Sequence, residues 1–213
     1  MKKKAVIFDL DGTLLDTLED LSRSVNFVMD KFHQPQLSKE KVAGFLGNGY
    51  RELIFKSLKD KEYLNEALEL FNAYYAEHLE DYTSPYPGIL NAISKLSQQN
   101  IKMAIVSNKG QVAVSQLREK FFDGLIDIAV GESATVRRKP NPDAVIEAMR
   151  GLGASAEETV YVGDSEVDIE TARRAGLPCL SCTWGFRTEE HLRKHGATHL
   201  LHSPHELVKY YSE

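Results

Sequence analysis

Two aspartates separated by one residue, Asp9 and Asp11, stand at the end of a short apolar segment near the start of the chain. Residues 5–10 are rich in β-branched side chains and run into Gly12, a pattern typical of a buried parallel strand that ends in a functional loop. Side chains i and i+2 of an extended chain point the same way, so both carboxylates can face one point. Like charges buried side by side need a cation or a proton to offset them. This requirement favours a divalent metal over the alternative, an acidic turn or helix start.

A second pair of carboxylates follows another apolar segment. Residues 160–163 are predicted to form a strand that ends in Asp164, and Asp168 lies four residues later at the start of a predicted helix. Oxygen ligands with no histidine nearby favour Mg²⁺ over zinc. Asp168 alone has an alternative interpretation, because carboxylates are common in the first turn of a helix, where they interact favourably with the helix dipole.

Two further groups could bind an anion. Ser107 and Asn108 follow the predicted strand 103–106, where a hydroxyl, an amide and the N–H groups of the next helix can bind phosphate oxygens. Lys139 lies in the segment 138–142, whose two prolines stiffen the loop and could hold an ammonium over a negatively charged site. Each signal is weak alone, since Ser and Asn are ordinary turn residues and most lysines are solvated at the surface.

An alternation of strands and helices along the chain would bring these groups together. Further strand-like segments are 102–107, 126–131, 159–163, 178–182 and 199–201. Helical segments are 89–99, 111–120, 143–151 and 168–175, the last followed by Gly176 as a C-cap. This alternation predicts an α/β fold with a Rossmann-like, doubly wound parallel sheet that is covered on both faces. In such a sheet, ligands bind at the carboxyl ends of the strands, where the polar residues of this chain gather.

Between residues 16 and 82 the pattern is helical only. Apolar residues recur at intervals of three and four in two stripes, Leu18, Leu21, Val25, Val28 and Phe32, and Leu64, Leu68, Phe71 and Tyr75. The segment 83–88 contains two prolines and is typical of a hinge or linker. We therefore predict an α/β catalytic core formed by residues 1–15 and 83–213, and an inserted helical cap domain formed by residues 16–82.

The four groups, taken together, resemble the four motifs of the haloacid dehalogenase superfamily in order and spacing. They are Asp9-Leu10-Asp11-Gly12-Thr13, Ser107-Asn108, Lys139-Pro140 and Gly163-Asp164 to Asp168. The resemblance implies a two-step phosphoryl transfer, in which Asp9 attacks phosphorus and Asp11 protonates the leaving alcohol and then helps to activate water. An acidic residue at the position of Asp11 separates the hydrolases of this superfamily from its dehalogenases.

The resemblance also assigns the remaining groups. Mg²⁺ would be held by Asp9, the backbone carbonyl of Asp11 and Asp164, with Asp168 in support directly or through water. The phosphate would be bound by Thr13, Ser107, Asn108 and Lys139.

The substrate depends on the cap and the surrounding loops. Residues 47–51 lie between two predicted cap helices, where similar phosphatases place their specificity loop, and Asn48 and Arg51 are the candidate substrate contacts. An exposed arginine at a helix start is an equal alternative for Arg51. The loops 85–88, 106–109 and 184–187 resemble the phosphoglycolate phosphatase subgroup. Pyrophosphate, nucleotide and sugar-phosphate phosphatases, and a phosphomutase, remain alternatives on the same fold, as does a non-catalytic binding protein.

The composition limits partners and location. The 213 residues carry a net charge of −5 with both signs scattered, so there is no basic stripe for a nucleic acid and no polybasic membrane patch. We expect a small phosphorylated metabolite as partner and leave the oligomeric state open between monomer and homodimer. No segment approaches the roughly 20 apolar residues of a membrane span, and the start is too short in apolar residues for a secretory signal. Two cysteines do not make a disulfide framework, which leaves the cytoplasm as the default.

Overall fold

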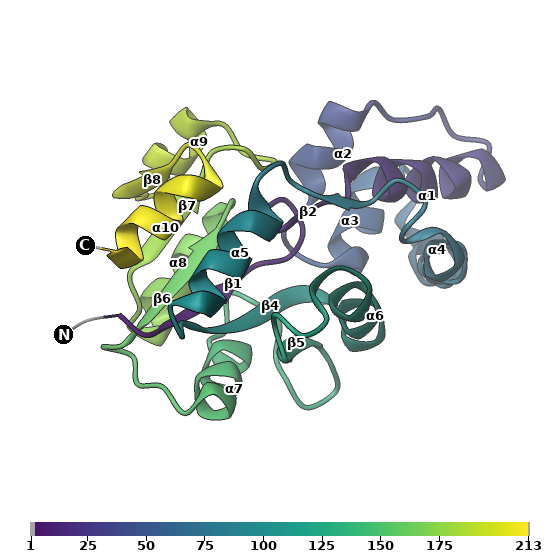
Figure 1. Cartoon of the computed structure of the whole chain (residues 1–213). Coiled ribbons are helices and arrows are strands. Elements are labelled where there is room, and N and C mark those ends of the chain that lie inside the picture. The colour runs from purple at the N-terminus through teal and green to yellow at the C-terminus, as the bar shows by residue number, and fades with distance from the viewer. Residues whose placement is uncertain (1–2, 213) are drawn as a thin grey trace.

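Strands and helices alternate along the core in the computed structural model, which describes residues 3–212. The strands are β1 (Ala5–Phe8), β2 (Leu15–Asp16), β3 (Ser84–Pro85), β4 (Lys102–Gly110), β5 (Ile128–Glu132), β6 (Thr159–Gly163), β7 (Cys179–Cys182) and β8 (His199–Leu201). The α-helices are α1 (Leu18–Lys31), α2 (Lys39–Phe45), α3 (Tyr50–Ser57), α4 (Leu64–His78), α5 (Ile89–Gln98), α6 (Gln111–Phe122), α7 (Asp143–Leu152), α8 (Glu166–Ala175), α9 (Glu189–Lys194) and α10 (Pro204–Ser212), and η1 (Lys61–Tyr63) is a short 3-10 turn. Figure 1 shows their arrangement.

Six parallel strands form the main sheet in the order β5-β4-β1-β6-β7-β8. The interior strand β1 pairs with β4 on one side and β6 on the other, and Phe8 stands opposite both Ile105 and Val162. The chain builds outward through β4 and β5 and then returns to β6, so the topology switches between β1 and β6. Ligands of doubly wound sheets bind at such a switch point. The predicted α/β fold class is confirmed, and the ends of β1, β4 and β6 are neighbours.

Helices cover both faces of this sheet because its strands are apolar on both sides. Along β1, Val6 and Phe8 belong to one hydrophobic cluster, while Ala5 and Ile7 belong to another. Successive side chains of a strand point to opposite faces, so the two clusters lie on opposite sides of the sheet. The first cluster includes residues of α5, α6 and α10, and the second includes residues of α7 and α8. A strand buried on both faces is apolar without alternation, as predicted for residues 5–10.

Some predicted boundaries need correction. Helix α8 begins at Glu166 rather than at Asp168, because Ser165 caps the helix: its side chain accepts a hydrogen bond from the Asp168 N–H, and the Asp168 side chain accepts one from the Ser165 N–H. Strand β4 continues to Gly110 rather than ending at residue 107, because Gly110 still pairs with Glu132 of β5 beyond an irregularity.

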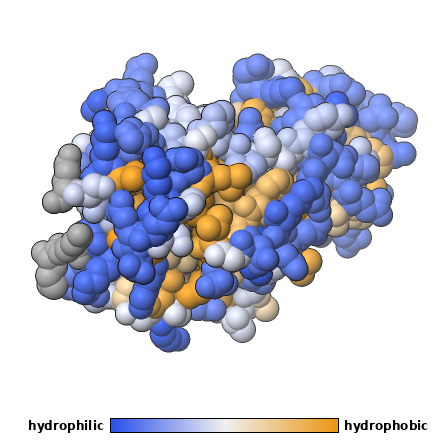
Figure 2. Space-filling model, in the orientation of Figure 1, coloured by the Kyte–Doolittle hydropathy of each residue, from blue (hydrophilic) through white to orange (hydrophobic). Residues whose placement is uncertain are grey.

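A helical region, α2 to α4, is inserted after β2, and Figure 1 shows it on one side of the core together with α1. Helices α1 and α4 carry the two predicted apolar stripes and pack against each other; the rings of Phe27 and Tyr74 stack with their centroids 4.0 Å apart. The predicted helical insertion is therefore confirmed. The face of the molecule in Figure 2 is hydrophilic around its margins and has hydrophobic residues gathered near its middle. None of the helices between residues 3 and 212 is long and apolar enough to cross a bilayer.

The insertion leaves and rejoins the core at one place. Strands β2 and β3 pair antiparallel, with Leu15 opposite Pro85 and Asp16 opposite Ser84. The carboxylate of the buried Asp20 then ties α1 to the returning chain: it accepts hydrogen bonds from the Tyr82 N–H at 3.0 Å, the Thr83 N–H at 2.8 Å and the Thr83 hydroxyl at 2.8 Å. The segment 83–88, predicted as a hinge or linker, is therefore held by hydrogen bonds to β2 and α1 where the insertion rejoins the core.

Removal of this carboxylate should destabilise the protein. Asp20→Ala leaves the donors of Tyr82 and Thr83 without their acceptor, so we expect the free energy of unfolding in urea to fall by roughly 2–3 kcal/mol. Asp30→Ala, an exposed position on the same helix, should stay within about 0.5 kcal/mol of the wild type. Equal losses in the two variants would contradict the role of Asp20.

Candidate active site

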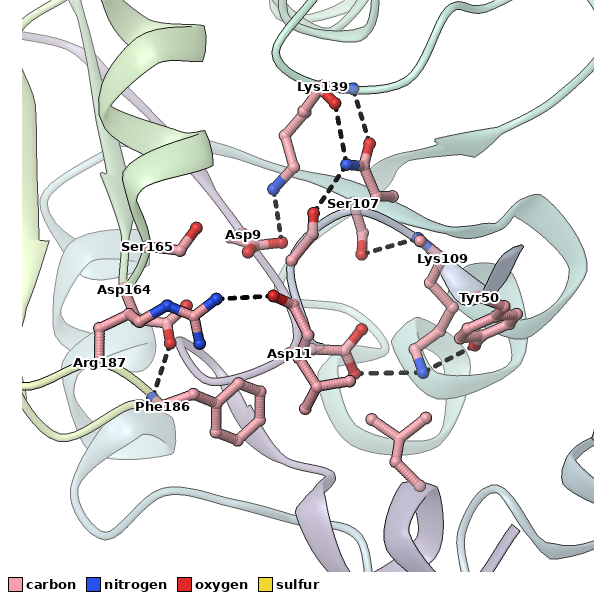
Figure 3. Close-up of a pocket in the computed structure, with 15 residues that line it drawn as sticks. Asp9, Asp11, Tyr50, Ser107, Lys109, Lys139, Asp164, Ser165, Phe186 and Arg187 are labelled. Carbon is pink, nitrogen blue, oxygen red and sulfur yellow. Dashed lines mark hydrogen bonds and ion pairs between the residues drawn. The ribbon is translucent and has the colours of Figure 1, made fainter. Parts of the chain in front are cut away.

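Segments from distant parts of the chain meet in one cavity at the carboxyl ends of β1, β4 and β6 (Figure 3). The core lines it with Asp9, Asp11, Ser107, Asn108, Lys109, Lys139, Asp164, Ser165, Phe186 and Arg187, and the cap side lines it with Leu21, Leu46, Gly47, Gly49 and Tyr50. Residues more than 150 positions apart in the chain thereby share one small volume, because the strands that carry them are hydrogen-bonded neighbours.

Asp9 lies at the centre of this cavity and is buried. Its Oδ1 accepts a hydrogen bond from the Leu10 N–H at 2.7 Å and lies 2.9 Å from the ammonium of Lys139. Burial raises the pKa of Asp9 well above its ordinary value, the charge of Asp168 adds to this rise, and Lys139 opposes it. Burial of the Asp9 carboxylate costs desolvation free energy, and its contacts with the Leu10 N–H and Lys139 offset part of this cost.

Asp164 faces Asp9 from the end of β6. Its Oδ2 accepts a hydrogen bond from the Phe186 N–H at 2.7 Å, and its Oδ1 accepts one from the Thr13 hydroxyl at 3.4 Å. Burial, followed by the charge of Asp168, raises the pKa of Asp164 to about 7. Thr13 is fully buried behind Asp164, so its hydroxyl contacts this carboxylate and does not line the cavity.

Asp168 is the helix-start carboxylate considered from the sequence, and it also contacts Lys139. Its Oδ2 accepts hydrogen bonds from the N–H and the hydroxyl of Ser165, at 3.1 and 2.5 Å, as a helix-start carboxylate does. Its Oδ1 accepts one from the Tyr161 hydroxyl at 3.0 Å and lies 2.7 Å from Nζ of Lys139. The capping interaction therefore fixes the carboxylate that in turn fixes the lysine.

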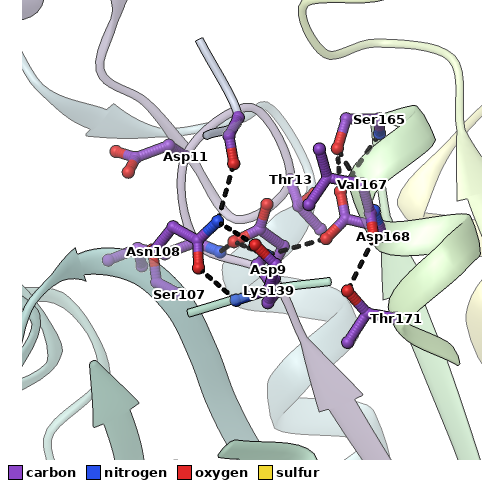
Figure 4. Close-up of polar contacts among 12 residues, drawn as sticks. Asp9, Asp11, Thr13, Ser107, Asn108, Lys139, Ser165, Val167, Asp168 and Thr171 are labelled. Carbon is purple, nitrogen blue, oxygen red and sulfur yellow. Dashed lines mark hydrogen bonds and ion pairs between the residues drawn. The ribbon is translucent and has the colours of Figure 1, made fainter. Parts of the chain in front are cut away.

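Lys139 is buried, which excludes the alternative of a solvated surface lysine. Burial lowers its pKa, but the charges of Asp168 and Asp9 outweigh this effect and hold the pKa above the ordinary value. Its main chain is held by Asn108, whose Oδ1 accepts from the Lys139 N–H at 2.6 Å and whose Nδ2 donates to the Lys139 carbonyl at 3.0 Å. Asn108 thus orients the lysine loop as well as lining the cavity (Figure 4).

The acidic cluster fits a divalent cation. Carboxylate oxygens of Asp9, Asp164 and Asp168 lie within 4.8 Å of one another, and all three residues are buried. Lys139 contacts Asp9 and Asp168 and offsets part of their charge. The raised pKa values of Asp9 and Asp164 show that the remaining negative charge is unfavourable without a further cation. Carboxylate oxygens are also the ligands that Mg²⁺ prefers.

Two glycines allow the backbone to approach the carboxylates closely. A Cβ atom on Gly163 would lie 2.4 Å from Cγ of Asp168, and one on Gly185 would lie 2.4 Å from Cβ of Asp164 and 2.3 Å from the Gly12 carbonyl oxygen. Gly163 stands inside a recognised motif. No signal in the sequence predicts the role of Gly185, because the groups that it touches come from distant segments.

Core side chains hold the cap through its backbone carbonyls. Arg187 donates to the carbonyls of Ala43 and Leu46 at 2.8 and 2.7 Å, and Asn108 donates to that of Gly47 at 2.9 Å. Arg138 also donates to the Asn48 carbonyl at 3.2 Å. Arg187 is itself oriented by Glu166, with 2.9 Å between Nε and Oε2. The carbonyls of Leu46, Gly47 and Asn48 lie beyond the C-terminus of α2, so these bonds give them partners from the core, whereas that of Ala43 also accepts from the Leu46 N–H.

The two residues of the cap that were predicted to contact the substrate, Asn48 and Arg51, are not among the described residues that line the cavity. Arg51 is exposed and donates a hydrogen bond to Asn65 at 3.1 Å. The cap contributes Tyr50 instead, whose hydroxyl meets Lys109 at 3.0 Å. Lys109 and Tyr50 belong to segments noted in the sequence, but their contact requires the cap to be docked.

The family model described as haloacid dehalogenase-like hydrolase matches residues 6–182, most of the chain. The chain belongs to this family. A phosphoglycolate phosphatase from Aquifex aeolicus (strain VF5) is 33% identical over 188 residues, covering 86% of each chain, and phosphoglycolate phosphatase 1 from Pseudomonas aeruginosa is 29% identical over 96% of this chain and 78% of the relative. The crystal structure of a proposed phosphoglycolate phosphatase from Lactobacillus delbrueckii subsp. bulgaricus superposes with a TM-score of 0.91 at 37% identity and 99% coverage of both chains.

Family membership confirms the resemblance predicted from the four motifs, which all lie within the matched residues. It also agrees with the six-stranded parallel sheet and the helical insertion of this haloacid dehalogenase-like hydrolase. A phosphorylated small molecule is the substrate class that the family implies.

The pKa of Asp164 predicts how metal binding depends on pH. Because the folded protein retains this proton up to about pH 7, whereas the ordinary value is 3.8, the metal-free protein should lose stability as the pH rises between these values. Metal ligands must be deprotonated, so Mg²⁺ should raise the melting temperature more at about pH 8 than at about pH 5. Thermal scans with Mg²⁺ or EDTA measure this.

The control for this prediction is Asp164→Asn, which keeps the shape of the side chain but removes its charge. This variant should lose most of the Mg²⁺-induced rise, and Asp30→Asn should retain it. A rise of the same size at both pH values would contradict the link between metal binding and the proton of Asp164, and no rise at either pH would contradict the metal site.

Proposed function

We propose that this haloacid dehalogenase-like hydrolase is a Mg²⁺-dependent phosphatase that forms an aspartyl-phosphate on Asp9. The observation that carries the proposal is the convergence of buried Asp9, Asp164 and Asp168 with Lys139 at the switch point of the sheet. A nucleophilic carboxylate, a candidate cation site and a fixed ammonium are the groups that phosphoryl transfer needs.

The chain's own residues bind and orient the phosphoryl group. Mg²⁺ would be held by Asp9, the Asp11 carbonyl and Asp164, and when bound it would neutralise charge on the transferring phosphoryl oxygens. Asp168 would support the cation directly or through water, and it also fixes Lys139, which its Oδ1 contacts. Lys139 and Ser107 both line the cavity, where they would bind the phosphoryl oxygens.

The reaction proceeds in two steps. A carboxylate oxygen of Asp9 forms a bond to phosphorus as the bond from phosphorus to the substrate oxygen breaks, and protonated Asp11 gives its proton to that oxygen. Water then attacks the phosphorus of the aspartyl-phosphate, Asp11 accepts the proton of that water, and the bond between Asp9 and phosphorus breaks to release inorganic phosphate. Asp11 lines the cavity beside Asp9, as both proton transfers require.

Phosphoglycolate is the substrate that we propose first. The support is that relatives covering most of the chain, at 29% and 33% identity, are phosphoglycolate phosphatases. Pyrophosphate, nucleotides and sugar phosphates are the alternatives, because substrate choice depends on the cap and on loops that vary on a shared core.

We also propose that residues 16–82 act as a cap domain over a core formed by residues 1–15 and 83–213. The pairing of β2 with β3 supports this division, because it brings the two connections of the insertion side by side. Movement about this crossing would open the cavity to substrate.

Phosphate release from a substrate panel tests the proposed function. Wild type with Mg²⁺ should hydrolyse phosphoglycolate faster than pyrophosphate, nucleotides or sugar phosphates, and EDTA should abolish the activity. Asp9→Asn should lower kcat by at least about 10³-fold, since it removes the nucleophile. Asp30→Asn, far from the cavity, serves as the matched control.

Three other outcomes would change the proposal. Activity that survives in Asp9→Asn would remove the nucleophile assignment, and a different preferred substrate would change only the substrate. Transfer of phosphate between positions of a bisphosphate-primed sugar, with little phosphate release, would indicate a mutase.

A further inference from the structure

Lys109 is a buried cation outside the four sequence motifs. Its side chain has no exposed area, and it lies at the carboxyl end of β4 between the core and the cap (Figure 3). Nζ lies 3.1 Å from Oδ1 of Asp11, and it donates hydrogen bonds to the hydroxyls of Tyr50 at 3.0 Å and Tyr75 at 2.5 Å. The two tyrosine hydroxyls accept two of the three donors of the ammonium, and the contact with Asp11 is an ion pair.

The two tyrosines form a packed support for this ammonium. Tyr50 begins α3 and Tyr75 lies on α4; their rings pack edge to face with centroids 5.4 Å apart, and Phe71 packs against both. Both tyrosines belong to the helical insertion, whereas Lys109 and Asp11 belong to the core. The ammonium is therefore held in place by side chains that reach it only when the cap is docked.

Asp11 depends on Lys109 in turn. Its Oδ1 is buried and accepts no aligned hydrogen bond from residues 3–212, so the ion pair with Lys109 is the contact that orients this oxygen. Asp9, Asp164 and Asp168, by contrast, each accept at least one hydrogen bond from a backbone N–H. Of these four aspartates, Asp11 is the one whose carboxylate is placed through a contact that continues into the cap.

We propose that Lys109 is a positioning residue that couples docking of the cap to the placement of Asp11. The inference rests on the proposed role of Asp11 in proton transfer. Tyr50 and Tyr75 hold the ammonium, and the ammonium holds the carboxylate that must reach the leaving oxygen. With the cap undocked, Lys109 loses two of its three partners, and Asp11 loses its fixed position.

Two small substrates with different leaving groups distinguish a loss of Asp11 positioning from a general loss of activity. Phosphoglycolate releases an alkoxide that needs a proton, whereas acetyl phosphate releases acetate, which needs none. In a rapid-quench measurement of the first turnover with Mg²⁺, Lys109→Met should slow phosphoryl transfer from phosphoglycolate by about 10²-fold, within the range for loss of an acid catalyst. Transfer from acetyl phosphate should change by less than about threefold.

A second variant leaves the lysine in place. Tyr50→Phe combined with Tyr75→Phe removes only the two hydroxyls, and it should slow transfer from phosphoglycolate by about tenfold with the same selectivity. Lys102→Met at the other end of β4, and Tyr74→Phe beside Tyr75 on α4, are matched controls that should behave as wild type.

The possible outcomes distinguish this inference from the proposed function. If wild type shows no Mg²⁺-dependent hydrolysis of either substrate, the proposed function fails. If wild type is active but Lys109→Met and the double tyrosine variant lose both substrates equally, or neither, the positioning role of Lys109 is overturned. Asp9→Asn should lose both substrates, because the nucleophile is needed whatever the leaving group.

Discussion

The burial of three carboxylates beside one ammonium is the constraint on which the rest of the site depends. Asp9, Asp164 and Asp168 lie within 4.8 Å of one another, and Lys139 contacts two of them. Such a group is stable only where fixed donors and a cation offset its charge. The fold provides donors from several directions: the Leu10 and Phe186 N–H groups, the Ser165 cap and the Tyr161 hydroxyl.

The sheet explains why these groups meet. Asp9 and Asp164 follow strands that pair directly, and the switch in topology between β1 and β6 leaves a crevice between the loops that follow them. Lys139 comes from the loop before α7 on the other side of β1, and Asn108 ties it into position. Apolar residues on both faces of β1 keep the strand in the middle of the sheet. The burial of β1 therefore both packs the core and positions Asp9, which follows the strand.

The cap is joined to this site by two kinds of contact. Arg187, Asn108 and Arg138 donate to backbone carbonyls near the end of α2, so these bonds do not require particular cap side chains. Lys109 instead reaches two specific hydroxyls, those of Tyr50 and Tyr75. The backbone contacts hold the end of α2 whatever its side chains, whereas the tyrosine contacts depend on two hydroxyls of α3 and α4.

The sequence by itself determined the α/β alternation, the helical insertion and the four motif segments. These features depend on local periodicity, on turn residues and on charges placed directly after apolar segments, all of which are visible in one dimension. Only the tertiary structure decided that Asp168 both caps α8 and holds Lys139, that Arg51 contacts Asn65, and that Lys109 joins Asp11 to the cap. The physical reason is that a side chain's partners are set by which distant segments pack beside it, and neither residue type nor spacing records that.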